Sequence, residues 1–230
     1  GHYVIVEHGE DGRYKLKKAI DLSKDQSYVL YSLSQEQLSH TMFPLGSMHK
    51  SETRTIAEAH GFISAKRKES QDICFIPDGD YASFIERYTG KKIASGNFVD
   101  MDGNVLGIHR GIIHYTVGQR KGLGLALKHP MYVQYIDVDN NEVVLGSNED
   151  LFKRELTAHN FNWVSIACPD APFRAKARIR YKHKEAPATI TPLSETEVKI
   201  VFDEPQRAIT KGQSVVVYDG DYVVGGGKIV

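Results

Sequence analysis

The nonapeptide Phe98-Val99-Asp100-Met101-Asp102-Gly103-Asn104-Val105-Leu106 is the place where the spacing of apolar residues changes to a period of two. Its apolar runs flank Asp102-Gly103, a dipeptide typical of hairpin turns because such turns need residues that accept a positive φ. The same pattern returns in the runs 132–138 and 143–145, and Asp219-Gly220-Asp221 marks a last turn. Short strands at this spacing predict a small barrel or sandwich from about residue 91 onward.

Before this point the pattern is that of a mixed α/β segment. A short strand is expected at 3–6, and Ser34-Gln35-Glu36-Gln37 fits a capping box that opens a helix. Two further helices are expected, with N-caps Ser51 and Asp80 and closing glycines Gly61 and Gly90.

Length and composition are those of a folded protein with two or three compact units. Of the 230 residues, 41% are hydrophobic and 25% are charged. No apolar run approaches the ~20 residues that span a bilayer and no signal-peptide pattern is seen, so we expect a cytoplasmic protein without membrane contact. The 29 basic and 29 acidic residues cancel, so a nucleic-acid partner must be inferred from local clusters. The opening residues 1–6 read as a loop entering a strand, as in a fragment of a longer protein.

Cys74 is the candidate reactive residue. It lies in Glu69-Ser70-Gln71-Asp72-Ile73-Cys74-Phe75-Ile76, after the basic run Lys66-Arg67-Lys68, and nearby positive charge favours the reactive thiolate. The alternative is a small buried hydrophobe, as free cysteines often are. The other cysteine, Cys168, is followed by Pro169, so we expect neither a disulfide framework nor, with scattered histidines, a metal site.

The basic run 173–184 predicts a strand with two unlike faces, because alternate side chains point to opposite sides. One face, directed to the core, would hold Phe173, Ala175, Ala177, Ile179 and, by its parity, Tyr181, unless a bulge or the end of the strand near Lys182 re-aims Tyr181. The other would hold Arg174, Lys176, Arg178, Arg180, Lys182 and Lys184. A row of cations without an acidic residue favours nucleic-acid binding, and the alternative is the solvated outer face of a barrel.

The segment 114–125 places three glycines around Arg120-Lys121, after an expected strand. Glycine lets a ligand approach the backbone closely, and Arg and Lys suit phosphate. The alternative is a glycine-rich turn whose charges are merely solvated.

Together these segments resemble the bacterial tRNA-specific 2-thiouridylases. The matching strings occur in order along nearly the whole chain and are Gly1-His2-Tyr3, Lys24-Asp25-Gln26-Ser27-Tyr28, Phe43-Pro44-Leu45-Gly46, Ser70 to Ile76, Thr116 to Gly124, Phe202-Asp203-Glu204-Pro205, Gly212-Gln213-Ser214 and Gly225-Gly226-Gly227. Each string is short, but the collinear set is specific.

The resemblance implies the fold class: an α+β N-terminal portion that is the tail of a PP-loop α/β domain, a small β-rich central domain and a C-terminal antiparallel β-barrel. The expected bounds are 1–79 for the first, 80–150 for the second and 151–230 for a tRNA-binding barrel. The stretch 151–156 is expected to link the two β units.

The resemblance also implies a reaction, the ATP-dependent transfer of persulfide sulfur to C2 of the wobble uridine of tRNA. ATP, used with Mg²⁺ as a substrate, adenylates the C2 oxygen, and a persulfide on Cys74 delivers the sulfur. A persulfide donor protein and tRNA are the implied partners of a monomer. The family's ATP-binding loop and its other catalytic cysteine, which is left disulfide-bonded to the first, are absent from this sequence, so we expect the chain alone to be inactive.

Further site residues follow from the resemblance one position at a time. Gly1 matches a glycine that contacts ATP. The positions that match tRNA-contacting residues are His2, Lys24, Asp25, Gln26, Arg180, Tyr181 and Gln213.

Two other hypotheses stay open. The chain is a non-catalytic RNA-binding module with a structural cysteine, or it is an unrelated thiol-dependent transferase. The latter needs a histidine base near Cys74, for which the sequence offers no obvious candidate. Alkylation rates of Cys74 and Cys168 distinguish a reactive thiol from a buried one.

Overall fold

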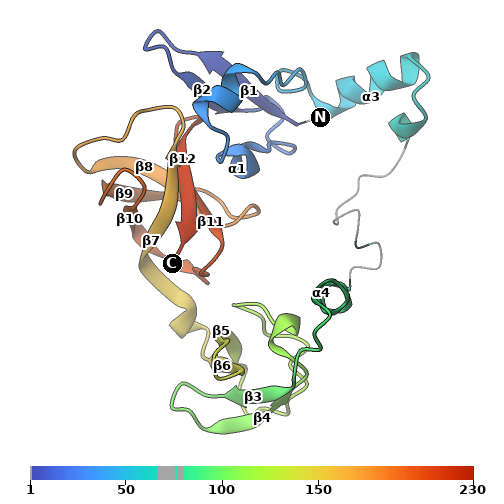
Figure 1. Cartoon of the computed structure of the whole chain (residues 1–230), viewed down its shortest axis with the longest axis vertical. Helices are drawn as coiled ribbons and strands as arrows, with labels where there is room; N and C mark the ends of the chain where they lie inside the picture. Colours follow the sequence, from blue (N-terminus) through green and yellow to red (C-terminus); the bar gives the residue numbers. More distant parts are fainter. Residues whose placement is uncertain (1, 67–75, 77–79) are drawn as a thin grey trace. The chain divides into compact units, whose positions relative to one another are not determined.

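The structure is a computed structural model that describes residues 2–66, 76 and 80–230 (Figure 1). Contacts divide the chain into two compact units. The barrel unit comprises Gly1–Arg67, Arg154–Pro205 and Lys211–Val230, and the central unit comprises Lys68–Lys153 and Gln206–Thr210. This division by contacts does not test the domain bounds expected at residues 79 and 150, which stay a prediction.

The antiparallel β-barrel expected at the C-terminus is confirmed. Its six strands lie in the order β12-β11-β8-β9-β10-β7, and pairing of β12 with β7 closes it. The strands are β7 (Phe152–Trp163), β8 (Phe173–Arg178), β9 (Ala186–Pro192), β10 (Val198–Arg207), β11 (Ser214–Asp219) and β12 (Tyr222–Ile229).

Strand β11 is buried on both faces, since Val215, Val216, Val217 and Tyr218 are each at most 1% exposed. Only one face of a barrel strand can line the interior. On the other face, Val216 and Tyr218 share a core cluster with residues of the N-terminal segment, namely Val4, Leu16, Tyr28, Tyr31 and Leu38. The N-terminal segment therefore covers the barrel at β11, and the two form one unit.

That segment consists of a hairpin and short helices. Strand β1 (Val4–His8) pairs with β2 (Tyr14–Lys18), and pairing of Lys17 with Tyr222 joins the hairpin to β12 of the barrel sheet. The helices are α1 (Ser27–Leu30), α2 (Gln35–Ser39) and α3 (Lys50–Ala59), followed by a 3₁₀ turn at Ile63–Lys66.

Two predicted helix starts are confirmed. Ser34 Oγ accepts from Gln37 N at 3.1 Å and Gln37 Oε1 accepts from Ser34 N at 2.9 Å, which is the expected capping box of α2. Asp80 caps α4 (Tyr81–Thr89) by accepting from Ser83 N at 3.1 Å, and Gly90 ends that helix with φ of 68°.

The predicted start of α3 is wrong. Its N-cap is His49 rather than Ser51, and the helix begins at Lys50. The Glu52 side chain accepts from His49 N at 2.6 Å, so the acidic residue of the first turn fixes the earlier start. Gly61 follows the helix with φ of 71°, as expected.

The central unit contains a sheet of four strands in the order β4-β3-β6-β5. They are β3 (Gly96–Val99), β4 (Val105–His109), β5 (Tyr132–Asp137) and β6 (Glu142–Gly146). Both predicted hairpins are confirmed, and parallel pairing of β3 with β6 joins them. Their shared core holds Phe98, Tyr115, Leu123, Val133, Val143 and Leu145.

The expected link at 151–156 contains the boundary between the two units, which lies after Lys153, and its residues from Phe152 onward form the start of β7, directly after the 3₁₀ turn Glu149–Leu151. A second connection lies at Gln206–Thr210, which belongs to the central unit and runs from the last two residues of β10 toward β11. There Arg207 Nε donates to Asn148 Oδ1 at 3.1 Å, and Ala208 N donates to Leu151 O at 2.8 Å.

Gly225 lies where β12 pairs with β7. A Cβ at this position would lie 2.4 Å from the Asn162 carbonyl oxygen and 2.5 Å from Phe161 Cε1. The backbone oxygen cannot move without disturbing the pairing that closes the barrel, so we expect Gly225→Ala to lower the free energy of unfolding by about 1–3 kcal/mol. Urea denaturation measures this, with the exposed Lys211→Ala as a control that changes it by less than about 0.5 kcal/mol. An unchanged midpoint for Gly225→Ala would contradict the close approach.

Candidate nucleic-acid interface

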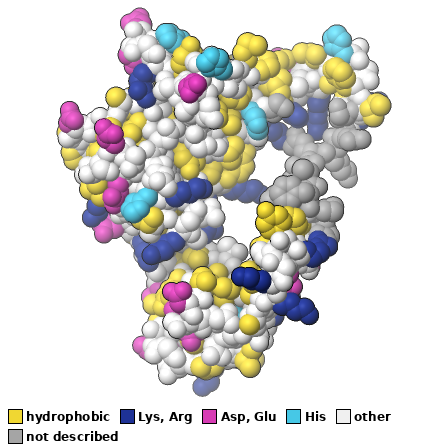
Figure 2. Space-filling view, viewed as in Figure 1, with side chains coloured by type: hydrophobic (Ala, Val, Ile, Leu, Met, Phe, Trp, Pro, Cys, Tyr) yellow, Lys and Arg dark blue, Asp and Glu magenta, His cyan; other side chains and the backbone are white. Residues whose placement is uncertain are grey.

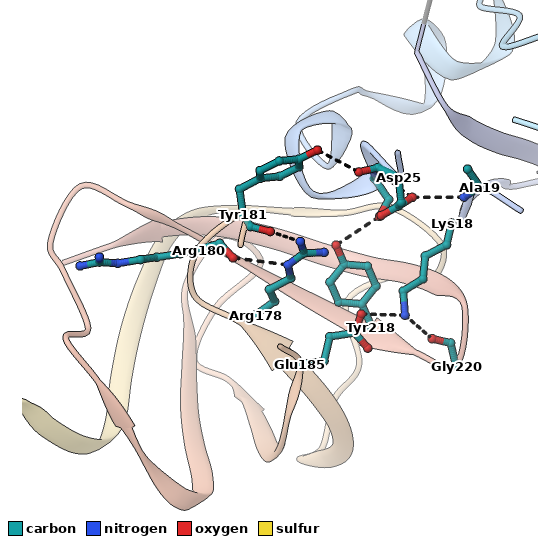
Figure 3. Close-up of polar contacts among 10 residues, drawn as sticks. Lys18, Ala19, Asp25, Arg178, Arg180, Tyr181, Glu185, Tyr218 and Gly220 are labelled. Atoms are coloured by element: carbon teal, nitrogen blue, oxygen red, sulfur yellow. Dashed lines mark hydrogen bonds and ion pairs between the residues drawn. The ribbon is translucent and has the colours of Figure 1, made fainter. Parts of the chain in front are cut away.

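Asp25 is the centre of a buried polar cluster in the barrel unit (Figure 3). Its side chain is 6% exposed. The carboxylate accepts from Ala19 N at 3.1 Å, from Ser27 N at 3.3 Å and from Ser27 Oγ at 2.6 Å. The carboxylate is therefore used within the protein, where it holds the loop 19–27 in one conformation.

Tyr218 and Lys18 extend this cluster toward the barrel. Ser27 Oγ lies 3.2 Å from the Tyr218 hydroxyl, whose pKa is raised by burial. Lys18 Nζ lies 4.7 Å from the centre of the Tyr218 ring and forms a 2.7 Å ion pair with Glu185. Because both charged side chains are largely buried, this pair ties β2 to the β8–β9 connection.

Tyr181 lies against the same loop. Its hydroxyl donates to the Asp25 carbonyl oxygen at 3.2 Å, and its ring lies 6.0 Å from that of Tyr28. The expectation that Tyr181 points into the core is wrong, because β8 ends at Arg178 and the side chain is 40% exposed. The alternation of a strand no longer applies beyond its last residue.

Arg178 holds the backbone that carries Arg180 and Tyr181. Its guanidinium donates to the Arg180 carbonyl oxygen at 3.3 Å and to that of Tyr181. The same group lies over the Tyr28 ring at 5.4 Å and over the Tyr181 ring at 5.5 Å. Figure 3 shows the Arg180 side chain extending away from this cluster.

His2 and Gln26 meet at the start of β1. Gln26 Oε1 accepts from Tyr3 N at 3.0 Å and lies 3.3 Å from His2 Nδ1, while Gln26 N donates to Tyr3 O at 3.0 Å. Lys24 lies in the same loop, where its amide donates to Asp21 O at 3.0 Å. His2, Lys24 and Gln26 thus lie on one short stretch of surface of the barrel unit, whereas Asp25 is buried beneath it.

Gln213 lies at the start of β11, next to Ser214. Ser214 is bonded from three sides: its carbonyl oxygen accepts from the Tyr28 hydroxyl at 2.7 Å, and its Oγ contacts the Tyr31 hydroxyl at 3.1 Å and Lys228 Nζ at 3.0 Å. Burial raises the pKa of Tyr28 to about 12, so its hydroxyl stays protonated and donates. Helix α1 therefore connects the loop 19–27 to the segment that presents Gln213.

The continuous basic face expected for 173–184 is corrected. Arg174 forms a two-bonded pair with Asp203, with Nη1–Oδ1 at 2.8 Å and Nη2–Oδ2 at 2.5 Å, and this pair lowers the pKa of Asp203. Lys199 pairs likewise with Glu155 at 2.9 Å. On the face drawn in Figure 2, acidic and basic side chains are interspersed over the barrel unit. Arg174 and Arg178 are therefore engaged within the protein, and the remaining basic residues of the run are Lys176, Arg180, Lys182 and Lys184.

Comparison with known proteins agrees with the resemblance. Three family models match: "tRNA methyl transferase HUP domain" over residues 1–78, "tRNA methyl transferase PRC-barrel domain" over 82–147 and "Aminomethyltransferase beta-barrel domain" over 153–229. Relatives named tRNA-specific 2-thiouridylase MnmA are 54% identical in Acetivibrio thermocellus, 53% in Clostridioides difficile and 50% in Halothermothrix orenii, each over the 230 residues of this chain. The chain belongs to the tRNA-specific 2-thiouridylase family. It spans 64% of the length of each of these relatives.

Two of the expected site residues, Gly1 and Cys74, lie outside the described residues. Cys168 is half-buried, and its Sγ lies 3.8 Å from the carbonyl oxygens of Pro169 and Ser194. In residues 2–66, 76 and 80–230, no group of His, Cys, Asp or Glu is placed to hold a metal ion. No helix in this same part of the chain is long and apolar enough to cross a bilayer.

Sequence reasoning missed the residues that support the interface. Ser27, Tyr28 and Tyr218 were not singled out, and Arg178 was assigned to a phosphate-binding face rather than to the backbone of residues 180 and 181. Ser27 and Tyr28 directly follow Lys24-Asp25-Gln26, so their place in the matching string was the one available signal.

Proposed function

We propose that the chain supplies the tRNA-binding surface and the sulfur-carrying cysteine of a tRNA 2-thiouridylase. The surface comprises His2, Lys24, Gln26, Arg180, Tyr181 and Gln213, and is called the barrel interface below. Asp25 supports this surface from the protein interior, because its carboxylate accepts hydrogen bonds from Ala19 and Ser27. The reaction is carried out by the whole protein, since about a third of the length of the relatives lies outside the part that this chain matches.

The proposed reaction replaces the C2 oxygen of the wobble uridine by sulfur. ATP first adenylates that oxygen and releases pyrophosphate, so that AMP becomes the leaving group. The terminal sulfur of a Cys74 persulfide, loaded by a donor protein, then bonds to C2. A second thiol attacks the remaining sulfur–sulfur bond, which leaves 2-thiouridine and a disulfide between the two cysteines. A thiolate is the nucleophile at each sulfur step.

The proposal rests on contacts between residues that lie far apart in the sequence. Positions 2, 25, 26 and 181 were each selected by resemblance alone, yet His2 contacts Gln26 at 3.3 Å, and Tyr181 bonds the backbone of Asp25 at 3.2 Å. Unrelated positions have no reason to converge in this way. A convergent set of exposed polar and aromatic side chains on a rigid support is what recognition of a single-stranded loop requires.

Tyr181→Ala is expected to weaken binding of an unmodified tRNA transcript to this chain by about 1–3 kcal/mol, the usual contribution of an aromatic ring that stacks on a base. Fluorescence anisotropy at fixed salt measures the affinity. The matched control is Tyr135→Ala in the central unit, since Tyr135 is 50% and Tyr181 is 40% exposed. Equal affinities of the two variants would refute the barrel interface.

The transferred group is tested in the full-length protein by the mass of the modified uridine. Replacement of oxygen by sulfur and addition of a methyl group give different mass increases. Methylation is included as an outcome because two of the matching family models are described as tRNA methyl transferase domains. We expect 2-thiouridine, formed only when ATP and a persulfide donor are both supplied. A methylated uridine would overturn the proposed reaction and leave RNA binding standing.

A further inference from the structure

The glycine-rich loop of the central unit, residues 116–131, encloses an open hollow of about 510 Å³, a size that suits a ligand. Its conformation depends on glycine, because Gly118, Gly122 and Gly124 have φ of 86°, 76° and 72°. Gln119 fixes the turn: its Oε1 accepts from Thr116 N and its Nε2 donates to Lys121 O, both at 3.0 Å. The glycine conformations and the Gln119 hydrogen bonds therefore hold the loop in a defined conformation around the hollow.

The floor of the hollow is apolar and continuous with the core of the central unit. Leu125, Leu127 and Met131 line it and pack against the buried cluster around Phe98 and Leu123. Leu125 also approaches β4 so closely that a Cβ on Gly107 would lie 2.4 Å from its Cδ2. A floor supported in this way keeps its shape, so the protein loses little conformational entropy when a ligand binds.

The rim of the hollow is cationic. Arg120, Lys128 and His129 line it and are exposed. From residue 103 to residue 136 the chain has no Asp or Glu, and its Arg and Lys residues there are Arg110, Arg120, Lys121 and Lys128. Among the described residues, no carboxylate pairs with Arg120, Lys121 or Lys128.

The loop thus differs from those places in the barrel unit where a cation pairs with a carboxylate, as Lys18, Arg174 and Lys199 do. A local excess of positive charge on a protein of zero net charge attracts an anion. The combination of cations with an apolar floor fits a ligand that has both phosphate and a flat apolar part. Guanidinium and imidazole planes stack on bases, and Arg and Lys bind phosphate.

We propose that this hollow binds a nucleotide of an RNA strand, with Arg120 and Lys128 on its phosphates and with His129 and the apolar floor against its base. The inference rests on the proposed function, because it takes the partner to be RNA. It adds a second contact region, in the central unit, to the barrel interface. Phosphate contacts here strengthen binding whatever the sequence, whereas contacts to the base carry selectivity.

The test compares two variants that remove the same charge from the central unit. Arg120→Ala/Lys128→Ala changes the rim, and Lys91→Ala/Lys92→Ala removes two exposed lysines outside the hollow. Binding of this chain to an unmodified tRNA transcript is measured by anisotropy at several salt concentrations. We expect the rim variant to weaken binding about tenfold and to flatten the slope of log affinity against log salt by about one to two units. The lysine control should keep the wild-type slope, and identical behaviour of both variants overturns the inference.

Two further arms separate the other outcomes. Tyr181→Ala, measured in parallel, reports on the barrel interface. If only Tyr181→Ala weakens binding, the hollow is not an RNA site. If only the rim variant weakens binding, the barrel interface is refuted instead. AMP in excess is the probe for a free nucleotide. It is expected to leave tRNA bound, since one nucleotide replaces few of the contacts, and competition by AMP that the rim variant abolishes would assign the hollow to a free nucleotide.

Discussion

Replacing Cys74 by serine in the full-length protein is expected to abolish thiolation of tRNA and to leave tRNA affinity nearly unchanged. A serine hydroxyl cannot carry a transferable sulfur atom, and phosphate contacts elsewhere on the protein dominate the affinity. The 2-thiouridine content of digested tRNA, measured by mass spectrometry, gives the first result, and anisotropy gives the second. At least a hundredfold loss of product is expected, on the order of the loss when a general catalytic group is removed.

Cys168→Ser is the matched control, because it makes the same chemical change at the other cysteine of the chain. The Cys168 sulfur lies near the backbone oxygens of Pro169 and Ser194, so this variant should retain thiolation. Product formation by Cys74→Ser would remove Cys74 from the mechanism and favour an RNA-binding module with a structural cysteine. Loss of product in both variants, with folding intact, would equally contradict the assignment to Cys74 alone.

Asp25→Ala is expected to have the largest effect on stability, lowering the free energy of unfolding by about 2–4 kcal/mol. The change removes an acceptor at 6% exposure and leaves the Ala19 amide and the Ser27 amide and hydroxyl without their partner. Urea denaturation gives the magnitude. Because the same loop carries Lys24 and Gln26, tRNA affinity should fall as well.

Asp203→Ala is the control for this change, since Asp203 is a half-exposed aspartate whose side chain pairs only with Arg174 among the described residues. It should shift the unfolding midpoint much less than Asp25→Ala does. If the two variants unfold alike, the polar cluster around Asp25 does not stabilise the barrel unit in the way inferred from its bonds.

The elements that could be predicted from the sequence are those governed by local rules. The turn at Asp102-Gly103, the capping box at Ser34 and the helix capped by Asp80 each depend on residues only a few positions apart. The start of α3 shows the limit of such rules, because the N-cap is His49, whose amide donates to the Glu52 side chain, and not Ser51.

What could not be predicted depends on contacts between distant segments. The alternation in 173–184 gave the right faces for Ala177 and Ile179, which are buried, but gave no indication that β8 stops at Arg178. At the end of β8, the Arg178 side chain bonds the backbone of residues 180 and 181 and lies over the Tyr28 ring. Tyr28 lies 150 residues earlier in the chain, so no window of sequence around Arg178 contains this information.

The segment Gln206–Thr210 completes the central unit after an interval in which β7 to β10 are made. During synthesis on the ribosome, Arg154–Pro205 must emerge before Arg207 can reach Asn148. At about 5–20 residues per second this takes roughly 3–10 s. For that time the nascent central unit lacks the contacts that Gln206–Thr210 supplies. Although most of its residues are translated before those of the barrel strands, the central unit therefore cannot complete its folding until β7 to β10 of the barrel and the residues up to Thr210 have been made.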